Sequence, residues 1–485
     1  MAPRTFPDTQ PDSLGRFWVP ESPDSRQPGV VEVAGSQVTL KVSPELTPMW
    51  EYQKVREGEI VGVPAKEQSN FVVLGTLVTK PQKITLVGTR TISRSEIGFF
   101  ASESEEAPTT HQTLRATWCL TGGHIKDPDT RFLGVQIDVT NLAEWALLQS
   151  LSSTRYPYKK EAIWRFSLPD GYDEALPDNR GYLTLQPTGL IEPLTIRGTT
   201  ITTDTKLEVE LNDDHGWTLT DAFSRLATPV TSLFTLLAGE RCGLRKLSVW
   251  DGSEWLSVHG RWLEPDSPER TDSLLLTVRD TGPKLLGQWM EMHERTSPVP
   301  QIVAAAVSNE FHTIESEALS LVTAIEALHR ILHPGDRRFD ENQITNAVVA
   351  LKGLGEDSMD PKLNESLRSA LKQHWWEKSY PQRVQDLAEP VAAAVPGSLG
   401  KVNKWRKAVV DQRISLAHGM SLKSDAFLKM DSLNRSIRWM LTLRLLLESG
   451  VPADVLAPAI DRSERFKSDR RYWRKHWPTI WVPKP

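Results

Sequence analysis

The spacing of apolar residues changes once along this chain and divides it into two parts. Before about residue 290, apolar residues mostly alternate with polar ones, as at Leu133, Val135, Ile137 and Val139. This period of two is typical of half-buried β-strands. After residue 300, apolar residues recur at every third or fourth position, as in amphipathic helices. The pattern predicts an α+β multidomain protein, with a β-rich N-terminal domain that holds a few packed helices, followed by an all-helical bundle.

Local signals place individual elements within the first part. Further alternating segments, which we predict to be strands, begin at Val38, Lys206 and Ser273. Asn141 follows the strand that ends at Val139 and is predicted to cap a helix, with Glu144 as its capping-box partner. Residues 221–239 are largely apolar and end in glycine, so a helix is expected there despite Pro229.

Helical periodicity predicts five helices in the second part, at about 318–332, 343–354, 364–376, 402–416 and 431–449. Short connections between helices favour a bundle. The last 27 residues are so rich in charge and tryptophan that we expect a tail and not a bundle helix. The predicted boundaries are an N-terminal tail at 1–15, a β-rich domain at 16–293, a linker at 294–300, a helical domain at 301–458 and a basic tail at 459–485.

The net charge of −5 hides an asymmetry along the chain. Residues 401–485 contain 18 basic and 8 acidic side chains. Such a local excess attracts polyanions, and nucleic acid is the obvious candidate. A solvated helix face followed by a charged tail explains the same excess equally well.

Composition also bears on the compartment. The first 13 residues, MAPRTFPDTQPDS, lack the apolar core of a secretion signal, and the most apolar stretches are interrupted by charged residues. The two cysteines, Cys119 and Cys242, provide neither a disulfide framework nor a paired zinc spacing. We therefore expect a cytoplasmic protein without a membrane segment.

The segment DQRISLAHGM carries the most informative pair of residues, Arg413 and His418. On a helix, Val409 and Leu416 mark the stripe that faces the core. Val410, Ile414 and Ala417 form a second apolar strip, with Arg413 at one edge and His418 at the other. A second apolar strip bordered by a cation and an imidazole suggests packing against a partner subunit.

The pair suits cleavage of RNA without a metal ion. Histidine has the near-neutral pKa required to take the proton of a 2′-hydroxyl, and arginine binds a phosphate through two parallel hydrogen bonds. The spacing alone is weak evidence, because Arg368 with His374 and Arg470 or Arg471 with His476 also satisfy it when four to six intervening residues are allowed. A histidine before a glycine also commonly stabilises the end of a helix.

Longer segments carry further information. In the helical part these are LVTAIEALHR and RISLAHG, and in the β-rich part they are GRFWVP, FLGVQIDVTNLAEW and AFSRLATPVTSLFTLLAG. They resemble segments of the ApeA-type HEPN proteins, a family of bacterial anti-phage factors, and RISLAHG holds that family's R-x4-6-H motif. The resemblance implies a HEPN-like helical bundle with Arg413 and His418 as catalytic residues, joined by Glu326 in the first helix. Many HEPN nucleases have a polar residue directly after the arginine, where this chain has Ile414.

The other candidate residues each have a structural interpretation as well as a functional one. Glu326 could orient Arg413 or His418, or it could be a solvated surface residue. Residues that could contact RNA through charge or stacking are Lys404, Lys407, Arg470, Arg471, Trp473, Arg474 and Lys475. The tryptophans of the tail could instead dock it onto the protein. His329 and His333 have metal-ligand spacing but lack an evident third ligand, so we expect no metal and no cofactor.

The leading hypothesis is a metal-independent HEPN endoribonuclease that acts as a toxin in abortive infection. It would form a homodimer or higher homo-oligomer through the HEPN domain and cleave RNA, with tRNA suggested by the resemblance. The N-terminal domain would sense a phage-derived trigger or restrain the nuclease. Two rivals stay open: a non-catalytic HEPN module that binds RNA or nucleotide or only oligomerises, and a carbohydrate-binding β domain fused to a helical oligomeriser.

Overall fold

The computed structural model divides the chain into two compact units. Unit 1 comprises Met1–Thr231 and Cys242–Thr271, and unit 2 comprises Ser232–Arg241 and Asp272–Pro485. The residues described are 13–34, 37–48, 50–56, 59–64, 69–78, 81–97, 109–148, 151–156, 161–191, 201–212, 216–264, 274–353, 359–371, 377–417 and 424–482.

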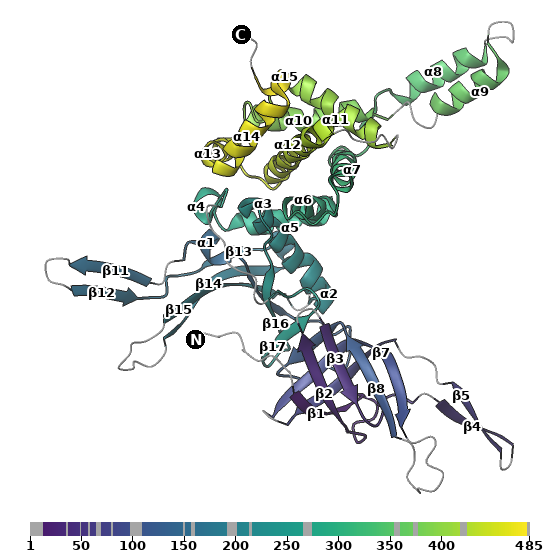
Figure 1. Cartoon of the computed structure of the whole chain (residues 1–485), viewed down its shortest axis with the longest axis vertical. Coiled ribbons are helices and arrows are strands. Elements are labelled where there is room, and N and C mark those ends of the chain that lie inside the picture. The colour runs from purple at the N-terminus through teal and green to yellow at the C-terminus, as the bar shows by residue number, and fades with distance from the viewer. Residues whose placement is uncertain are drawn as a thin grey trace. The chain divides into compact units, whose positions relative to one another are not determined.

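Within the described residues, unit 1 is built on a sheet of thirteen strands, whose arrangement can be followed in Figure 1. In spatial order they are β13 (Tyr172–Ala175), β14 (Gly181–Ile191), β15 (Ile201–Leu211), β10 (Gly134–Val139), β16 (Leu244–Trp250), β17 (Trp255–Gly260), β9 (Trp118–Thr121), β7 (Gln82–Ile97), β6 (Ser69–Leu77), β1 (Ser13–Trp18), β2 (Gln27–Ala34), β3 (Gln37–Val42) and β8 (Thr109–Ala116). Two hairpins, β4 (Trp50–Arg56) with β5 (Glu59–Pro64) and β11 (Leu151–Tyr156) with β12 (Glu161–Phe166), form separate small sheets.

Six of these strands close into a barrel. The ring runs β7, β6, β1, β2, β3, β8 and returns to β7, because β7 pairs with both β6 and β8. Phe17, Val31, Leu40, Ile84 and Leu114 are fully buried inside it. The alternation predicted from Val38 and from Lys206 is confirmed by strands β3 and β15.

The strand predicted around Val135 is confirmed as β10, and it is buried on both faces. Its polar positions are satisfied by neighbours, since Gln136 donates to Glu208 at 2.7 Å and Asp138 accepts from Arg245 at 2.6 Å. Asn141 precedes the short helix α1 (Leu142–Ala146) but has φ of 68° and makes no side-chain capping bond. The predicted capping box at Asn141 and Glu144 is therefore wrong.

The helix expected at 221–239 is confirmed as a run of three elements: α2 (Leu219–Ala222), the π-helical turn η4 (Phe223–Ala227) and α3 (Thr228–Ala238). A short 3-10 turn, η2 (Pro177–Asn179), lies elsewhere in unit 1. The residues that close α3 belong to unit 2. There the carbonyl of Leu237 accepts a hydrogen bond from the backbone N–H of Leu275 at 3.0 Å, and the carbonyl of Leu236 accepts one from the side chain of Arg465 at 3.1 Å.

Helices make up the rest of unit 2 within the described residues. They are α4 (Val278–Thr281), α5 (Lys284–Thr296), α6 (Val299–Val307), α7 (Ile314–Leu332), α8 (Glu341–Lys352), α9 (Pro361–Ala370), α10 (Tyr380–Ala394), α11 (Val402–Ala417), α12 (Ser424–Glu448), α13 (Ala453–Arg462), α14 (Glu464–His476) and α15 (Pro478–Trp481). The strand predicted from Ser273 is wrong, because α4 occupies part of that segment. The linker expected at 294–300 instead contains the end of α5 and the start of α6.

Four helices form the centre of unit 2. Helix α7 packs against α10, α11 and α12, and its apolar stripe is buried as predicted, for example at Leu321, Ile325 and Leu328. Helices α8 and α9 form a separate hairpin (Figure 1). Within the described residues, no helix combines the length and apolar character needed to cross a membrane.

The C-terminal segment forms helix α14, which packs against α12, so the prediction of a tail in place of a bundle helix is wrong. Helix α14 is amphipathic and buries Phe466 and Trp473, which pack edge-on with ring centroids 5.5 Å apart. Trp473 also contacts Trp481 of the following short helix. Trp477 donates to the carbonyl of Lys429 at 3.0 Å and Trp481 to that of Ser398 at 3.4 Å, so the tryptophans dock this segment onto the rest of unit 2, which is the alternative that the sequence left open.

Candidate active site

Helix α11 presents one face to the core and another to solvent. Trp405 and Gln412 lie on the inner face and fix the rotation of the helix, since Trp405 donates to Ser436 at 2.9 Å and Gln412 donates to Asn434 at 2.7 Å. Both acceptors belong to α12. This rotation leaves Arg413 on the accessible side of the helix.

Arg413 is held in place by two neighbours from other helices. Its guanidinium lies 4.6 Å from the ring centroid of Tyr380, at the start of α10, and one of its nitrogens lies 3.5 Å from Oε2 of Glu326 on α7. The arginine side chain is nevertheless 44% exposed. A cation stacked on a ring and paired on one side keeps N–H donors available for a ligand.

Glu326 is fixed by a buried arginine. Its Oε1 accepts hydrogen bonds from Arg383 at 3.1 Å and from Arg330 at 3.3 Å. Arg383 is almost fully buried and also donates to Glu377 and to the backbone carbonyl of Lys378. Because Arg383 has two carboxylate partners, Glu326 can hold Arg413 without leaving a buried charge unpaired. Glu326, which the sequence suggested could orient Arg413 or His418, thus lies within ion-pair distance of Arg413, and its part in catalysis stays a prediction.

Tyr380 does not serve as an acid or base in this arrangement. Burial raises the pKa of its phenol far above the usual range, although the Arg413 charge opposes that rise. Its hydroxyl donates to the backbone carbonyl of Val322 at 3.3 Å. Tyr380 is therefore a neutral platform for the guanidinium of Arg413.

The apolar strip beside Arg413 is open to solvent at Ile414 in the single chain. Ile414 is 48% exposed, and Val410 is half-buried. The side chain of Ala417 and the whole of His418 lie outside the described residues. The pairing of Arg413 with His418 accordingly stays a prediction.

Two family models match the chain in agreement with this architecture. ApeA N-terminal domain 1 matches residues 12–258, and the Apea-like HEPN domain matches residues 319–455. The chain belongs to the ApeA-type HEPN family. No curated protein and no solved structure matches it.

The HEPN match covers α7 to α12, and therefore includes Glu326, Arg383 and Arg413. HEPN domains are typically ribonucleases that bind RNA and dimerise, and the two matches together support a nuclease-type role in antiviral defence.

Sequence reasoning missed the part of the candidate site that lies on α10. Proline is unfavourable in the interior of a helix, so Pro381 and Pro390 argue against a helix in this segment. One available signal was the capping box formed by Ser379 and Gln382, with Pro381 in the first turn, where proline is tolerated. That start signal would have located the helix, and with it Tyr380 and Arg383.

The residues that were predicted to contact RNA differ in their exposure to solvent. Those whose side chains are exposed are Lys404, Lys407, Arg471, Arg474 and Lys475. Arg470 is half-buried. Trp473 is fully buried, so its predicted role as a stacking surface for RNA is wrong: its indole fills the contact between α14 and α15.

Three side chains of the types that bind metal ions lie close together near the candidate site, but two of them are already paired with a lysine. Ligand atoms of His329, Asp336 and Asp386 lie within 4.8 Å of one another. The ammonium group of Lys378 binds Asp336 at 2.6 Å and Asp386 at 2.8 Å. Burial alone would raise the pKa of Asp386, but hydrogen bonds from Lys378 and His329 outweigh it and lower that pKa. The lysine thus occupies the place that a metal ion would require.

Proposed function

We propose that this protein is a metal-independent endoribonuclease of anti-phage defence, which acts as a toxin in abortive infection. The observation that carries the proposal is the exposed guanidinium of Arg413, fixed by Glu326 and Tyr380 next to the exposed apolar side chain of Ile414. RNA is the substrate class, and tRNA is the RNA that the family resemblance suggests.

The chemistry needs two groups at the scissile phosphate. Arg413 would bind the phosphate oxygens and stabilise the charge that develops there. His418 would take the proton of the 2′-hydroxyl as its oxygen attacks phosphorus. The bond from phosphorus to the 5′-oxygen then breaks, and that oxygen accepts a proton from the second copy's histidine or from water. The products are a 2′,3′-cyclic phosphate and a 5′-hydroxyl.

Dimerisation would complete the site. Two copies of α11 that pack through Ile414 around a twofold axis would bring two Arg413 side chains into one cleft. Lys404 and Lys407 are exposed on the same helix and add positive charge that attracts RNA. The assembly would be a homodimer or a higher homo-oligomer.

The β-rich domain would provide the control. A phage-derived trigger that binds it, or the loss of a restraint that it exerts, would switch on the nuclease. The thiol of Cys119 is buried and lies outside any disulfide, which favours the reducing cytoplasm as the compartment.

Purified protein incubated with total RNA, with and without a chelator, tests the proposal. We expect cleavage that resists the chelator, is abolished by Arg413→Ala or His418→Ala, and is kept by Arg406→Ala, which removes another arginine from α11. The folded state of each variant is checked by circular dichroism. RNA binding without cleavage would support the non-catalytic module instead, and retention on glycan columns would support the carbohydrate-binding reading.

A further inference from the structure

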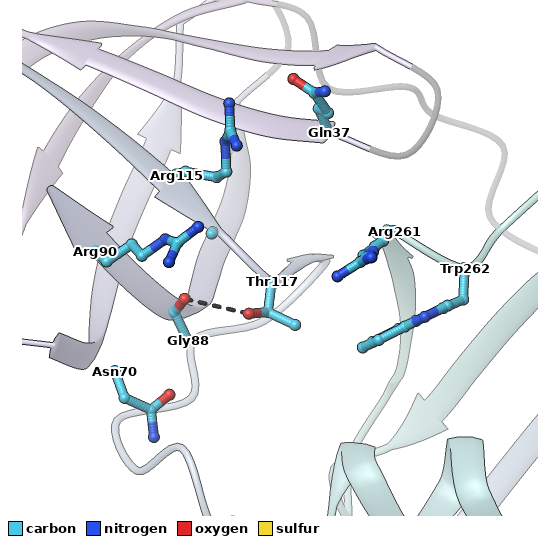
Figure 2. A pocket seen from close by; sticks show the side chains of 9 residues that line it. Gln37, Asn70, Gly88, Arg90, Arg115, Thr117, Arg261 and Trp262 are labelled. Atoms are coloured by element: carbon cyan, nitrogen blue, oxygen red, sulfur yellow. Dashed lines mark hydrogen bonds between the residues drawn. The ribbon is translucent and has the colours of Figure 1, made fainter. Parts of the chain in front are cut away.

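A cavity of about 770 Å³ lies in unit 1, at the edge of the barrel. Its lining includes Arg90, Arg115, Arg261 and Trp262, together with Gly88 and Thr117 (Figure 2). Arg90 and Arg261 extend toward the middle from opposite walls, and the Trp262 indole lies beside Arg261. Three arginines and no carboxylate line this space within the described residues.

The cavity lies where strand β7 changes its pairing partner. Strand β7 pairs with β9 up to Val87 and with β8 from Arg90 onward. Thr117 bridges β8 and β9 and donates its hydroxyl to the Gly88 carbonyl at 3.3 Å. Gly88 has φ of 68°, and a Cβ there would lie 2.7 Å from Oγ1 of Thr117, so only glycine allows this close approach.

Two of the arginines that line the pocket repel each other when no anion is bound. Arg90 and Arg115 lie directly opposite each other in the register of β7 and β8. Like charges in that position destabilise a sheet. An anion bound in the pocket would relieve this repulsion.

The aromatic wall is rigid. The ring of Trp262 stacks on Phe223, with centroids 4.7 Å apart and planes at 30°, and it also lies 4.8 Å from Trp118. The residue is still 38% exposed. A fixed, partly exposed indole next to arginines offers a stacking surface for a flat ring.

We propose that this pocket binds a nucleotide, with its phosphates on Arg90, Arg115 and Arg261 and its base on Trp262. A bare phosphate would leave the indole unused and most of the cavity empty. A neutral sugar would not repay the desolvation of three guanidinium groups. The volume falls within the range of small-ligand sites. The same chemistry is provided by a free nucleotide and by one nucleotide of a single-stranded RNA.

Isothermal titration distinguishes these sources and tests the site. The full chain, in an Arg413→Ala background that prevents cleavage, is titrated with ATP, AMP, inorganic phosphate and a single-stranded RNA octanucleotide. The test variant carries Arg90→Gln with Arg261→Gln, both at exposed positions, and Arg16→Gln is the matched control, an exposed arginine elsewhere on the barrel.

Binding of a free nucleotide, or of the octanucleotide, that weakens about 100-fold or more in the double variant and is unchanged in Arg16→Gln supports the proposal. Preference for ATP or AMP identifies a free nucleotide as the ligand, and preference for the octanucleotide identifies RNA. The proposal is overturned if none of these ligands binds, if binding survives the double variant, or if inorganic phosphate binds as tightly as the nucleotides. Because no cleavage is measured, the result is independent of the proposed nuclease activity.

Discussion

An aspartate at position 414 is expected to separate two copies of this protein and leave each copy folded. Ile414 is 48% exposed in the single chain, so no core contact of unit 2 depends on its full side chain. A surface substitution of this kind changes the free energy of unfolding by about 0.5 kcal/mol. The effect should therefore fall on assembly.

The magnitude follows from what the seam would bury. Fully burying an isoleucine side chain contributes about 1.5–3 kcal/mol, so covering the exposed half contributes about 1 kcal/mol per copy and about 2 kcal/mol per twofold dimer. Aspartate removes this term and adds two carboxylates whose desolvation costs at least about 2 kcal/mol more in total. Since about 1.4 kcal/mol corresponds to a factor of ten, the Kd of the dimer should rise about 1000-fold or more.

Analytical ultracentrifugation over a concentration series, beside an RNA cleavage assay, measures both consequences. Val349→Asp is the matched control, because Val349 is a 60% exposed apolar residue on α8, outside the proposed seam. We expect Ile414→Asp to be monomeric and inactive and Val349→Asp to behave as the unmodified protein does. An Ile414→Asp protein of unchanged oligomer size that still cleaves RNA would refute the shared-site argument.

Three further predictions concern the arginine, its positioning residue and the response to pH. Arg413→Lys should lower kcat about 100-fold or more with RNA affinity changed only a few-fold, as measured by single-turnover kinetics and filter binding, since lysine loses the planar fork. Glu326→Gln should lower the cleavage rate about tenfold while KM stays near its original value, and Arg330→Gln should not, because Arg383 still holds Glu326 in that control. Burial lowers the pKa of His293 from 6.5 to about 4. Between these pH values the unfolded chain binds a proton that the folded chain does not bind, so the free energy of unfolding decreases as pH falls from about 6.5 toward 4. This residue alone should cost about 2 kcal/mol between pH 7 and pH 5, and urea unfolding of His293→Met should show a correspondingly smaller difference between those two pH values.

Elements with strong periodicity could be predicted from the sequence because one physical effect, burial of a single face, determines them. Helix α7 and strand β3 are examples, as is the inner face of α11, where Trp405 and Val409 are buried. The same argument placed Ile414 outside the core of its own bundle.

The features that could not be predicted depend on tertiary contacts, which produce no periodic pattern in the sequence. Arg383 looks like a surface residue in the sequence, yet it is buried because Glu326, distant along the chain, and Glu377, six residues before it, neutralise it. Helix α14 has so many charges that its buried side, Phe466 and Trp473, is hard to recognise as a core stripe. Prolines concealed α10 for a similar reason, because local propensity argued against a helix that packing stabilises.

The ten residues Ser232–Arg241 have a consequence for how such chains can be recombined. They lie in the N-terminal half of the sequence but belong to the helical unit, where the carbonyl of Leu236 accepts the hydrogen bond of Arg465. Gly239 passes so close to that arginine that a Cβ there would overlap its guanidinium. A chimera joined near residue 300 would take Gly239 and Arg465 from different parents. Any exchange of N-terminal domains between related proteins, in the laboratory or in evolution, must therefore inherit these ten residues together with α14.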